Sequence, residues 1–367
     1  MYRKTTTVIV SSCLLFFMAA TAQAAKFQVG DVENMTIDFW GFSQLTMEQF
    51  DRQDTSGDPD LGDRDSFEFD ADRVRFGAKV RWGQWFGNLH LDANSSSSAK
   101  RVGGLSGFIR DANAGYKFSN AAKIKLGQFK TPLGMAFNGS GSKLPLPKRT
   151  FTDRLAFDRT LGIMLSGRKM GGAKGSGFGY DLFVGNPVGR AGTASQSSDQ
   201  IGDEHTWVAR VMYDLGKNLH IETAYGEVGE AGGKGTEDLE TFDIGVAGKL
   251  SPAIKYRAEF IQSDNVRGNK DDEEEAWFVE LAYAFDKMLE GVIRYEEAEF
   301  DSTDNSDIDA FEVGLNMYMG QNKKNNRLQV SYRSVGGDEE DYKGRAATRG
   351  FADHKWDAFL AQFQFFY

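Results

Sequence analysis

Basic side chains occupy four of five alternate positions in one short segment, and Gly77 occupies the fifth. The residues Arg73, Arg75, Lys79 and Arg81 alternate with the apolar residues of 74–82. In an extended strand, residues two apart point to the same face at a spacing of about 6.7 Å. Guanidinium and ammonium groups bind phosphate and carboxylate oxygens, and a row of weak sites lets an anion move from one to the next. The segment therefore predicts a ladder of anion contacts.

Further basic residues continue this pattern. Lys123 and Lys125 alternate with Ile124 and Leu126, and the pattern can include Lys117. The polar segment 131–158 is long enough to fold into an enclosed space and narrow it. We predict pore-lining and anion-binding roles for Arg73, Arg75, Lys79, Arg81, Lys123, Lys125 and Arg154, the last of which lies in 131–158.

Acidic residues fall on the corresponding face of later segments. Arginines interrupt this acidic set, so it is not uniformly negative. A basic wall opposite an acidic one produces a transverse field, which admits small polar solutes with little preference. The pattern therefore leaves anion preference and non-selective passage both open. The acidic set is Asp111, Glu222, Glu259, Glu280, Glu296 and Glu312, with Arg210, Arg257, Arg294 and Arg333 among them.

The elements that carry these residues repeat with a period of two, which indicates strands. Tight turns, such as 83–84 and 216–218, alternate with long polar loops, such as 94–107 and 187–205. Most segments are longer than the strands of a soluble sandwich, and aromatic residues gather at their ends. We predict an all-β fold: a transmembrane antiparallel β-barrel of about 16 strands with short periplasmic turns and long extracellular loops. The connection 167–177 is long for a turn.

The composition agrees with a barrel and excludes two other classes of protein. Mean hydropathy is −0.46, and beyond the N-terminus no apolar run approaches the roughly 18 residues of a membrane helix. An aromatic share of 13% is too high for a disordered chain. Strands that alternate apolar and polar residues conceal a lipid-facing surface in a polar average.

The N-terminus has the features of a secretory signal peptide. A basic start, an apolar stretch and the small-residue motif 22–24 predict a signal peptide over 1–24 and a barrel domain over 25–367. The single cysteine, Cys13, falls inside the signal, so disulfides and thiolate metal sites are not expected. Removing Arg3 and Lys4 changes the net charge from −10 to −12. This acidity disfavours nucleic-acid binding.

Enzyme motifs are missing from the sequence. The four histidines, at 90, 205, 220 and 354, have no metal-ligand spacing, and no Gly-x-Ser-x-Gly motif occurs. We therefore expect no catalytic residue, no cofactor and no metal. The acidic runs 51–65 and 271–275 are typical of solvated loops, and divalent ions that bridge lipopolysaccharide are the alternative.

Several stretches resemble the family of phosphate-selective porins O and P. They are ADRVRFGAKVRWGQWFGNLHLD at 71–92, AGYKFSNAAKIKLGQFKTPLGM at 114–135, DRTLGIML at 158–165 and YDLFVGNP at 180–187. GQFK-x-P is the most specific of these motifs. The resemblance implies a sixteen-stranded, trimeric porin of the bacterial outer membrane, with anion preference in the members that gave the family its name.

Residues and resemblance together predict a water-filled channel for passive diffusion of small hydrophilic solutes, favouring anions such as phosphate. The expected partners are small anionic or polar solutes, outer-membrane lipid and lipopolysaccharide, and identical subunits in a homotrimer, with no nucleic acid. Two alternatives remain. One is a general non-selective diffusion porin, and the other is a structural or adhesive barrel with acidic surface loops.

Overall fold

The computed structural model describes residues 26–28, 34–54, 64–94, 108–173, 175–187, 205–229, 237–299, 307–319, 326–337 and 354–367. The predicted signal peptide lies outside these residues, as does 55–63 of the acidic segment 51–65. The acidic run 271–275 lies within them.

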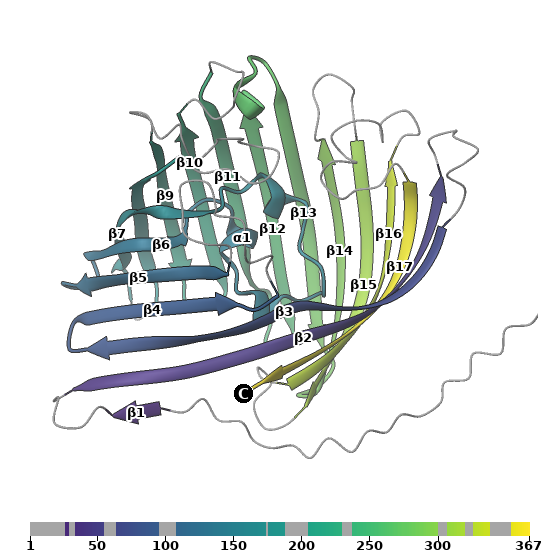
Figure 1. The fold of residues 1–367 in the computed structure, drawn as a ribbon, viewed down its shortest axis with the longest axis horizontal. Helices are drawn as coiled ribbons and strands as arrows, with labels where there is room; N and C mark the ends of the chain where they lie inside the picture. The colour runs from purple at the N-terminus through teal and green to yellow at the C-terminus, as the bar shows by residue number, and fades with distance from the viewer. Residues whose placement is uncertain are drawn as a thin grey trace, which may run out of the picture.

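The chain forms strands joined in chain order. Their bounds are β1 Lys26–Gln28, β2 Met35–Asp54, β3 Arg64–Trp82, β4 Trp85–Asp92, β5 Ile109–Lys117, β6 Lys123–Lys130, β7 Arg159–Gly171, β8 Gly177–Gly185, β9 Thr206–Leu215, β10 Leu219–Val228, β11 Leu239–Lys249, β12 Ile254–Asp264, β13 Glu273–Ala284, β14 Leu289–Glu299, β15 Asp307–Met319, β16 Asn326–Gly337 and β17 His354–Phe366. From β2 to β17, each strand pairs antiparallel with the next (Figure 1).

Pairing between β17 and β2 closes the ring. Leu360 lies opposite Glu48 and Phe366 lies opposite Phe42, while the short β1 pairs with the first part of β2. The described strands β2–β17 therefore form a closed antiparallel barrel of sixteen strands, which confirms the predicted fold class. Closure satisfies the backbone hydrogen bonds of every strand, as a lipid environment requires.

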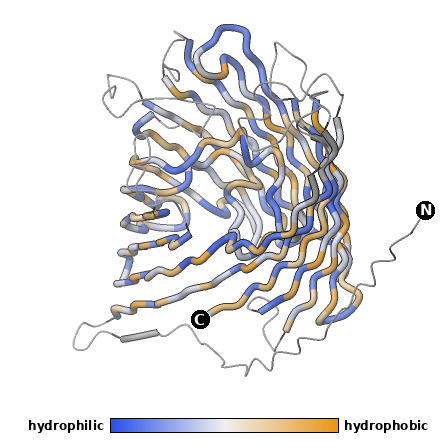
Figure 2. The backbone as a smooth tube through the Cα atoms, turned by 45° about the vertical axis from the view of Figure 1, so that its right-hand side comes forward, coloured by the Kyte–Doolittle hydropathy of each residue, from blue (hydrophilic) through white to orange (hydrophobic). Residues whose placement is uncertain are grey.

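The alternation of each strand sorts its side chains into an inner and an outer face. Along β3, Phe76 and Trp82 are exposed, whereas Arg75 is buried. Along β13, Val279 and Leu281 are exposed, whereas Glu280 is buried. Figure 2 shows apolar and polar residues alternating along the strands. The outer face is therefore the apolar one, as the period of two predicts.

The connection at 167–177 is much shorter than the sequence suggests. Strand β7 continues to Gly171 and β8 begins at Gly177. A register shift between Gly167 and Met170 accommodates the irregular spacing. A β-bulge of this kind inserts unpaired residues without ending a strand. The interpretation of 167–177 as a long connection was wrong, and the turn is tight like its neighbours.

Short helices lie outside the strands. They are α1 Met135–Asn138, the 3₁₀ turn η1 Gly141–Lys143, α2 Thr152–Leu155 and the 3₁₀ turn η2 Val266–Gly268. In the described part of the chain, no helix has the length and apolar character needed to cross a membrane.

Segment 131–158 holds three of these helices and folds into the barrel, where α1 lies against β11 (Figure 1). Its apolar side chains are almost fully buried and pack against apolar residues on the inner face of the wall. The cluster joins Leu133, Phe137, Phe151 and Leu155 of the segment to Met164, Val208, Leu239 and Ile261 of the strands. We call 131–158 the inner loop.

Candidate functional site

Two wall carboxylates hold the inner loop through its backbone. Glu259 on β12 accepts hydrogen bonds from the backbone N–H of Ala136, at 3.0 Å, and from the hydroxyl of Thr152, at 2.5 Å. Glu296 on β14 accepts the backbone N–H of Phe151 at 2.7 Å. Glu259 and Glu296 therefore fasten α1 and the start of α2 to the wall.

Amide side chains hold the middle of the inner loop. Gln329 on β16 and Asn316 on β15 each donate to the carbonyl of Pro145 at 2.9 Å. Gln44 on β2 donates to the carbonyl of Gly141 at 3.1 Å. These contacts fall on β15, β16 and β2, within four consecutive strands of the ring, whereas the loop begins after β6 and ends before β7. The loop therefore crosses the barrel interior.

The predicted acidic wall faces inward, and at Glu296 and Glu312 its charge is compensated locally. Arg294 lies 2.6 Å from Glu312 and 3.4 Å from Glu296. Arg333 lies 2.7 Å from Glu296 and 3.1 Å from Glu312. All four side chains are buried. The network pairs two cations with two anions, so it contributes little net field across the interior.

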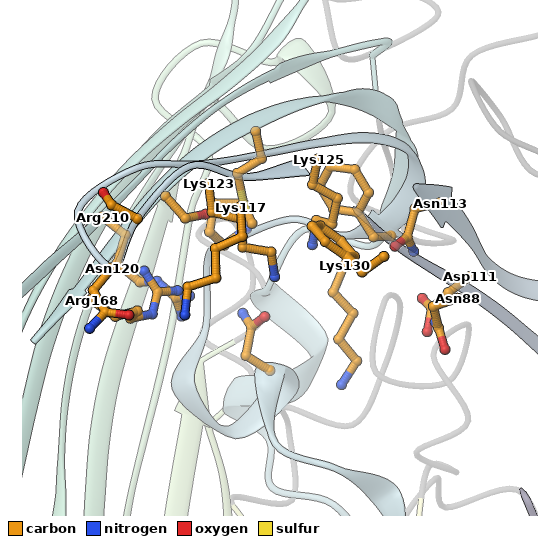
Figure 3. A pocket seen from close by; sticks show the side chains of 17 residues that line it. Asn88, Asp111, Asn113, Lys117, Asn120, Lys123, Lys125, Lys130, Arg168 and Arg210 are labelled. Atoms are coloured by element: carbon orange, nitrogen blue, oxygen red, sulfur yellow. The ribbon is translucent and has the colours of Figure 1, made fainter. Parts of the chain in front are cut away.

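A basic cavity of about 580 Å³ lies on the opposite side, between the inner loop and the turn end of β4–β9 (Figure 3). We call it the lysine cavity. Lysines of β5 and β6 project into it, with Arg168 and Arg210 at one side and Asp111 at the other. Its charged and amide lining is Asn88, Asp111, Asn113, Lys117, Asn120, Lys123, Lys125, Lys130, Asn138, Arg168 and Arg210, and its apolar lining is Phe86, Phe129, Pro132 and Met164.

The cations of the lysine cavity fall into two groups. Arg168 and Arg210 both bind Asp181, at 2.8 and 2.5 Å. The four lysines have no carboxylate within ion-pair distance among the residues that the structure describes. Lys123 and Lys125 instead lie over the rings of Phe86 and Phe129, at 4.2 and 3.6 Å from the centroids. Lys130 donates to the carbonyls of Phe137 and, at 2.9 Å, Gly139.

A second cavity of about 210 Å³ has mixed charge. Two of its four cations have near carboxylates, since Lys255 bonds Glu290 and Arg257 lies 3.2 Å from Glu280. The other two, Lys143 and Arg327, form no ion pair with the residues that the structure describes. The lining of the second cavity therefore includes two glutamates beside its cations, whereas the lysine cavity gathers four lysines that have no ion-pair partner in the described ranges.

The structure does not bring the seven predicted residues together. Lys123 and Lys125 line the lysine cavity. Arg73 donates to the Gln44 carboxamide at 2.7 Å, and Arg75 binds Asp92 at 2.8 Å. The remaining three are dispersed: Lys79 lies 5.4 Å from the Trp40 ring, Arg81 binds Asp38 at 3.1 Å, and Arg154 lies on α2. The ladder of 73–81 is therefore partly neutralised.

Sequence reasoning missed two cations of the cavity. Lys130 is the last residue of β6 and belongs to the GQFK-x-P motif. It lies an odd number of positions after Lys123, so strict alternation places it on the opposite face of the strand. Arg168 was assigned to a glycine-rich connection, whereas it lies in β7 beside the bulge. Only an extension of the strand alternation through 167–171 could have predicted that Arg168 lies in a strand.

Lys148 of the inner loop bridges two carboxylates of the wall. It bonds Glu48 on β2 and lies 3.3 Å from Asp72 on β3. Burial lowers the pKa of Lys148, but the two carboxylates outweigh this effect and hold the pKa above its ordinary value of 10.5. One carboxylate oxygen from each of Glu48, Asp70 and Asp72 lies within 4.8 Å of the other two. The Lys148 ammonium group offsets part of the negative charge of this cluster.

Comparison with known structures shows a shared fold. An anion-selective porin from Comamonas acidovorans superposes with a TM-score of 0.65 at 12% identity, covering 91% of this chain and 100% of that one. The outer membrane channel DcaP of Acinetobacter baumannii gives 0.60 at 15%, covering 90% and 98%. A loop-deletion mutant of OmpT from Vibrio cholerae gives 0.57 at 15%, covering 91% and 100%.

Comparison by sequence identifies the family. No curated protein matches the chain. The family model described as phosphate-selective porin O and P matches residues 46–225, which include β3–β9, the inner loop and the whole lysine cavity. This agrees with the resemblance seen in the motifs at 71–187. Through residues 46–225, the chain belongs to the outer-membrane porin family of phosphate-selective porins O and P.

Proposed function

We propose that the barrel is a channel for passive diffusion of small hydrophilic solutes that favours anions, phosphate among them. One observation carries the anion preference. Lys117, Lys123, Lys125 and Lys130 face a 580 Å³ cavity, and within the described ranges no carboxylate forms an ion pair with them. Ammonium groups without a counter-charge attract anions from the solution that fills the barrel.

The net charge of −10 does not oppose this proposal. A solute in a narrow, low-dielectric space responds to the local potential, and distant charges are screened over about 8–10 Å at ordinary salt. In the acidic wall, Glu296 and Glu312 are compensated by Arg294 and Arg333. A transverse field, on which the non-selective alternative depends, is weakened for the same reason.

The reversal potential in a planar bilayer with a KCl gradient tests the proposal. We expect the sign that corresponds to chloride permeating faster than potassium. The double variant Lys123→Gln and Lys125→Gln removes two charges from the cavity and should shift the potential toward cation preference. The matched control is Lys217→Gln with Lys287→Gln, which removes two exposed lysines from the turns after β9 and β13.

Three outcomes would contradict the proposal. Purified protein that forms no channels would favour the structural or adhesive alternative. Channels with no ion preference would favour the general diffusion porin. An equal shift in the cavity variant and the control variant would remove the lysine cavity from the selectivity mechanism.

We further propose that residues 1–24 direct export and that three copies assemble in the outer membrane, in contact with lipid and lipopolysaccharide. The fold supports assembly as a trimer, because an in-vitro folded OmpT from Vibrio cholerae, described as a trimer form, has the same fold at a TM-score of 0.54. Chemical cross-linking of the protein in native outer membranes tests the trimer. Cross-linked species no larger than a monomer would contradict it.

A further inference from the structure

Apolar side chains share one cross-strand row of the wall at the lysine cavity, with a glycine and a lysine between them. Cross-strand pairing joins Phe86 to Gly115, Gly115 to Lys125, Lys125 to Met164 and Met164 to Phe183. The row therefore crosses β4–β8 with one cation at its centre. The interior of a porin barrel is usually polar, because it is filled with water. An apolar side chain that lines an open cavity, as Phe86 does, departs from this pattern.

The sequence makes room for the first member of this row. Gly115 leaves the space that a side chain would fill, because a Cβ there would lie 2.3 Å from the Phe86 ring. The ring can therefore lie against the β5 backbone. The Lys123 ammonium group lies over the same ring, 4.2 Å from its centroid. Phe86 is only half-buried, so part of it lines the open cavity.

A polar row lies beside the apolar one. Lys117 pairs directly with Lys123, and Lys123 pairs with Ser166. Like charges directly opposite each other across two strands are destabilising unless a counter-charge lies between them. In the described part of the chain, no protein carboxylate lies within ion-pair distance of either lysine. A bound anionic group at this pair would therefore relieve a repulsion that the fold leaves in place.

The two rows together have the chemistry of an amphipathic ligand site. Ligand sites commonly combine an apolar lining with a few convergent charged groups and occupy about 300–1,000 Å³. Orthophosphate gains nothing from contact with Phe86 or Met164, because it has no apolar surface to remove from water. A carboxylate with a hydrocarbon body gains from both rows. It can place its oxygens near Lys123 and Lys125 and its body along Phe86 and Met164.

We propose that, among the anions the channel admits, the lysine cavity binds small organic carboxylates with an apolar body in preference to inorganic phosphate. This inference rests on the proposed anion preference and specifies the class of solute. The site comprises Lys123 and Lys125 as carboxylate contacts and Phe86 and Met164 as apolar contacts, all within one cavity lining.

Block of the KCl current tests this inference in single channels. Benzoate, acetate and phosphate are added in turn at a pH where each is ionised, and the half-blocking concentration of each is measured. Benzoate and acetate share the carboxylate and differ in their apolar body. We expect benzoate to block at a concentration about fivefold lower than acetate or phosphate, which corresponds to partial burial of one ring.

Variants locate the site. Phe86→Asn should raise the half-blocking concentration of benzoate toward that of acetate and leave acetate unchanged. Met164→Gln keeps an unbranched side chain and should act in the same direction, which guards against misfolding at Phe86. The control is Phe118→Ser in the turn after β5, where the ring is 60% exposed and outside the cavity.

The outcomes separate this inference from the proposed function. Channels without anion preference would overturn both. Anion-preferring channels that benzoate and acetate block equally, or that phosphate blocks more strongly than benzoate, would overturn only the preference for organic carboxylates. Benzoate block that survives both Phe86→Asn and Met164→Gln would show that the site lies elsewhere, and would overturn the assignment to this cavity.

Discussion

Glu296 on β14 accepts the backbone N–H of Phe151 at 2.7 Å, although the two residues are 145 positions apart. The same side chain lies 2.7 Å from Arg333. One carboxylate thus joins the charge network of the wall to the inner loop. The position of the loop therefore depends on a residue whose inward direction the strand pattern predicts but whose partner it does not.

Replacing Glu296 should loosen the inner loop without opening the barrel. Glu296→Ala removes the acceptor for Phe151 and leaves Arg333 with less buried counter-charge. Loss of one partner of a buried pair costs about 3–5 kcal/mol. We expect larger current fluctuations in single channels and easier proteolysis within 131–158. Barrel folding, followed by the mobility of unheated protein in detergent gels, should be retained.

The control for this variant is Glu297→Ala, which removes a carboxylate from the next position of β14, on the outer face. Its current fluctuations should match those of the wild type. Equal noise in both variants would mean that Glu296 does not hold the loop.

Lys148 provides a pH-dependent attachment of the same loop. Because its pKa is raised above 10.5 by Asp72 and Glu48, the bridge contributes fully below the ordinary lysine pKa and is lost only as pH rises past the shifted value. We expect the loop to stay attached between about pH 6 and pH 10. Current noise should increase at more alkaline pH.

Other lysines titrate at alkaline pH, so the informative comparison is with Lys148→Arg. A guanidinium group stays charged throughout this range. The arginine variant should show a smaller alkaline increase in noise than the wild type. Identical profiles would assign the alkaline change to other residues.

The strand pattern was enough to predict much of the fold. The period of two gives both the strands and the inward direction of Glu259, Glu280 and Glu296, and each is buried inside the barrel. It could not predict the bulge that shifts the register between Gln44 and Thr46. Because of this shift, both Asp72 and Arg73 contact inner-face residues, contrary to simple alternation.

The candidate site was less predictable than the fold. Lys123 and Lys125 follow from alternation, but whether a cation has a counter-charge depends on neighbours in space. Asp92 neutralises Arg75 from the next strand, and nothing in the local sequence of either indicates the pair. The apolar side of the inner loop, including Phe151 and Leu155, has its partners on distant strands.

Gly127 should be sensitive to any side chain. Its φ of +120° is rarely adopted by other residues, and a Cβ would lie 2.3 Å from the carbonyl oxygen of Ala112. Gly127→Ala should destabilise the β5–β6 pairing by about 2 kcal/mol. Gly87→Ala is the matched control, because a Cβ there meets nothing closer than 3.7 Å. Urea unfolding in detergent should separate the two, and equal stability would contradict the geometry.

Arg75 and Lys79 should contribute to ion selectivity by a similar amount, although only Arg75 has a carboxylate partner among the described residues. Arg75 forms a buried pair with Asp92, whereas Lys79 is exposed and contacts the Trp40 ring. Lys79→Gln should lower the ratio of anion to cation permeability by about twofold, since one uncompensated charge is removed. Arg75→Gln should lower it similarly, because the Asp92 charge then loses its guanidinium partner.

The double variant Arg75→Gln with Asp92→Asn tests whether the unpaired Asp92 charge causes the lower ratio. It removes one positive and one negative charge from the same pair, so the local potential changes little. The permeability ratio, obtained from reversal potentials in a KCl gradient, should return to the wild-type value. Lys79→Gln combined with Asp92→Asn should leave Arg75 without this counter-charge and also restore the ratio, because the channel senses the summed local charge. A ratio that stays low in both double variants would mean that Arg75 and Lys79 act through direct contact with the anion.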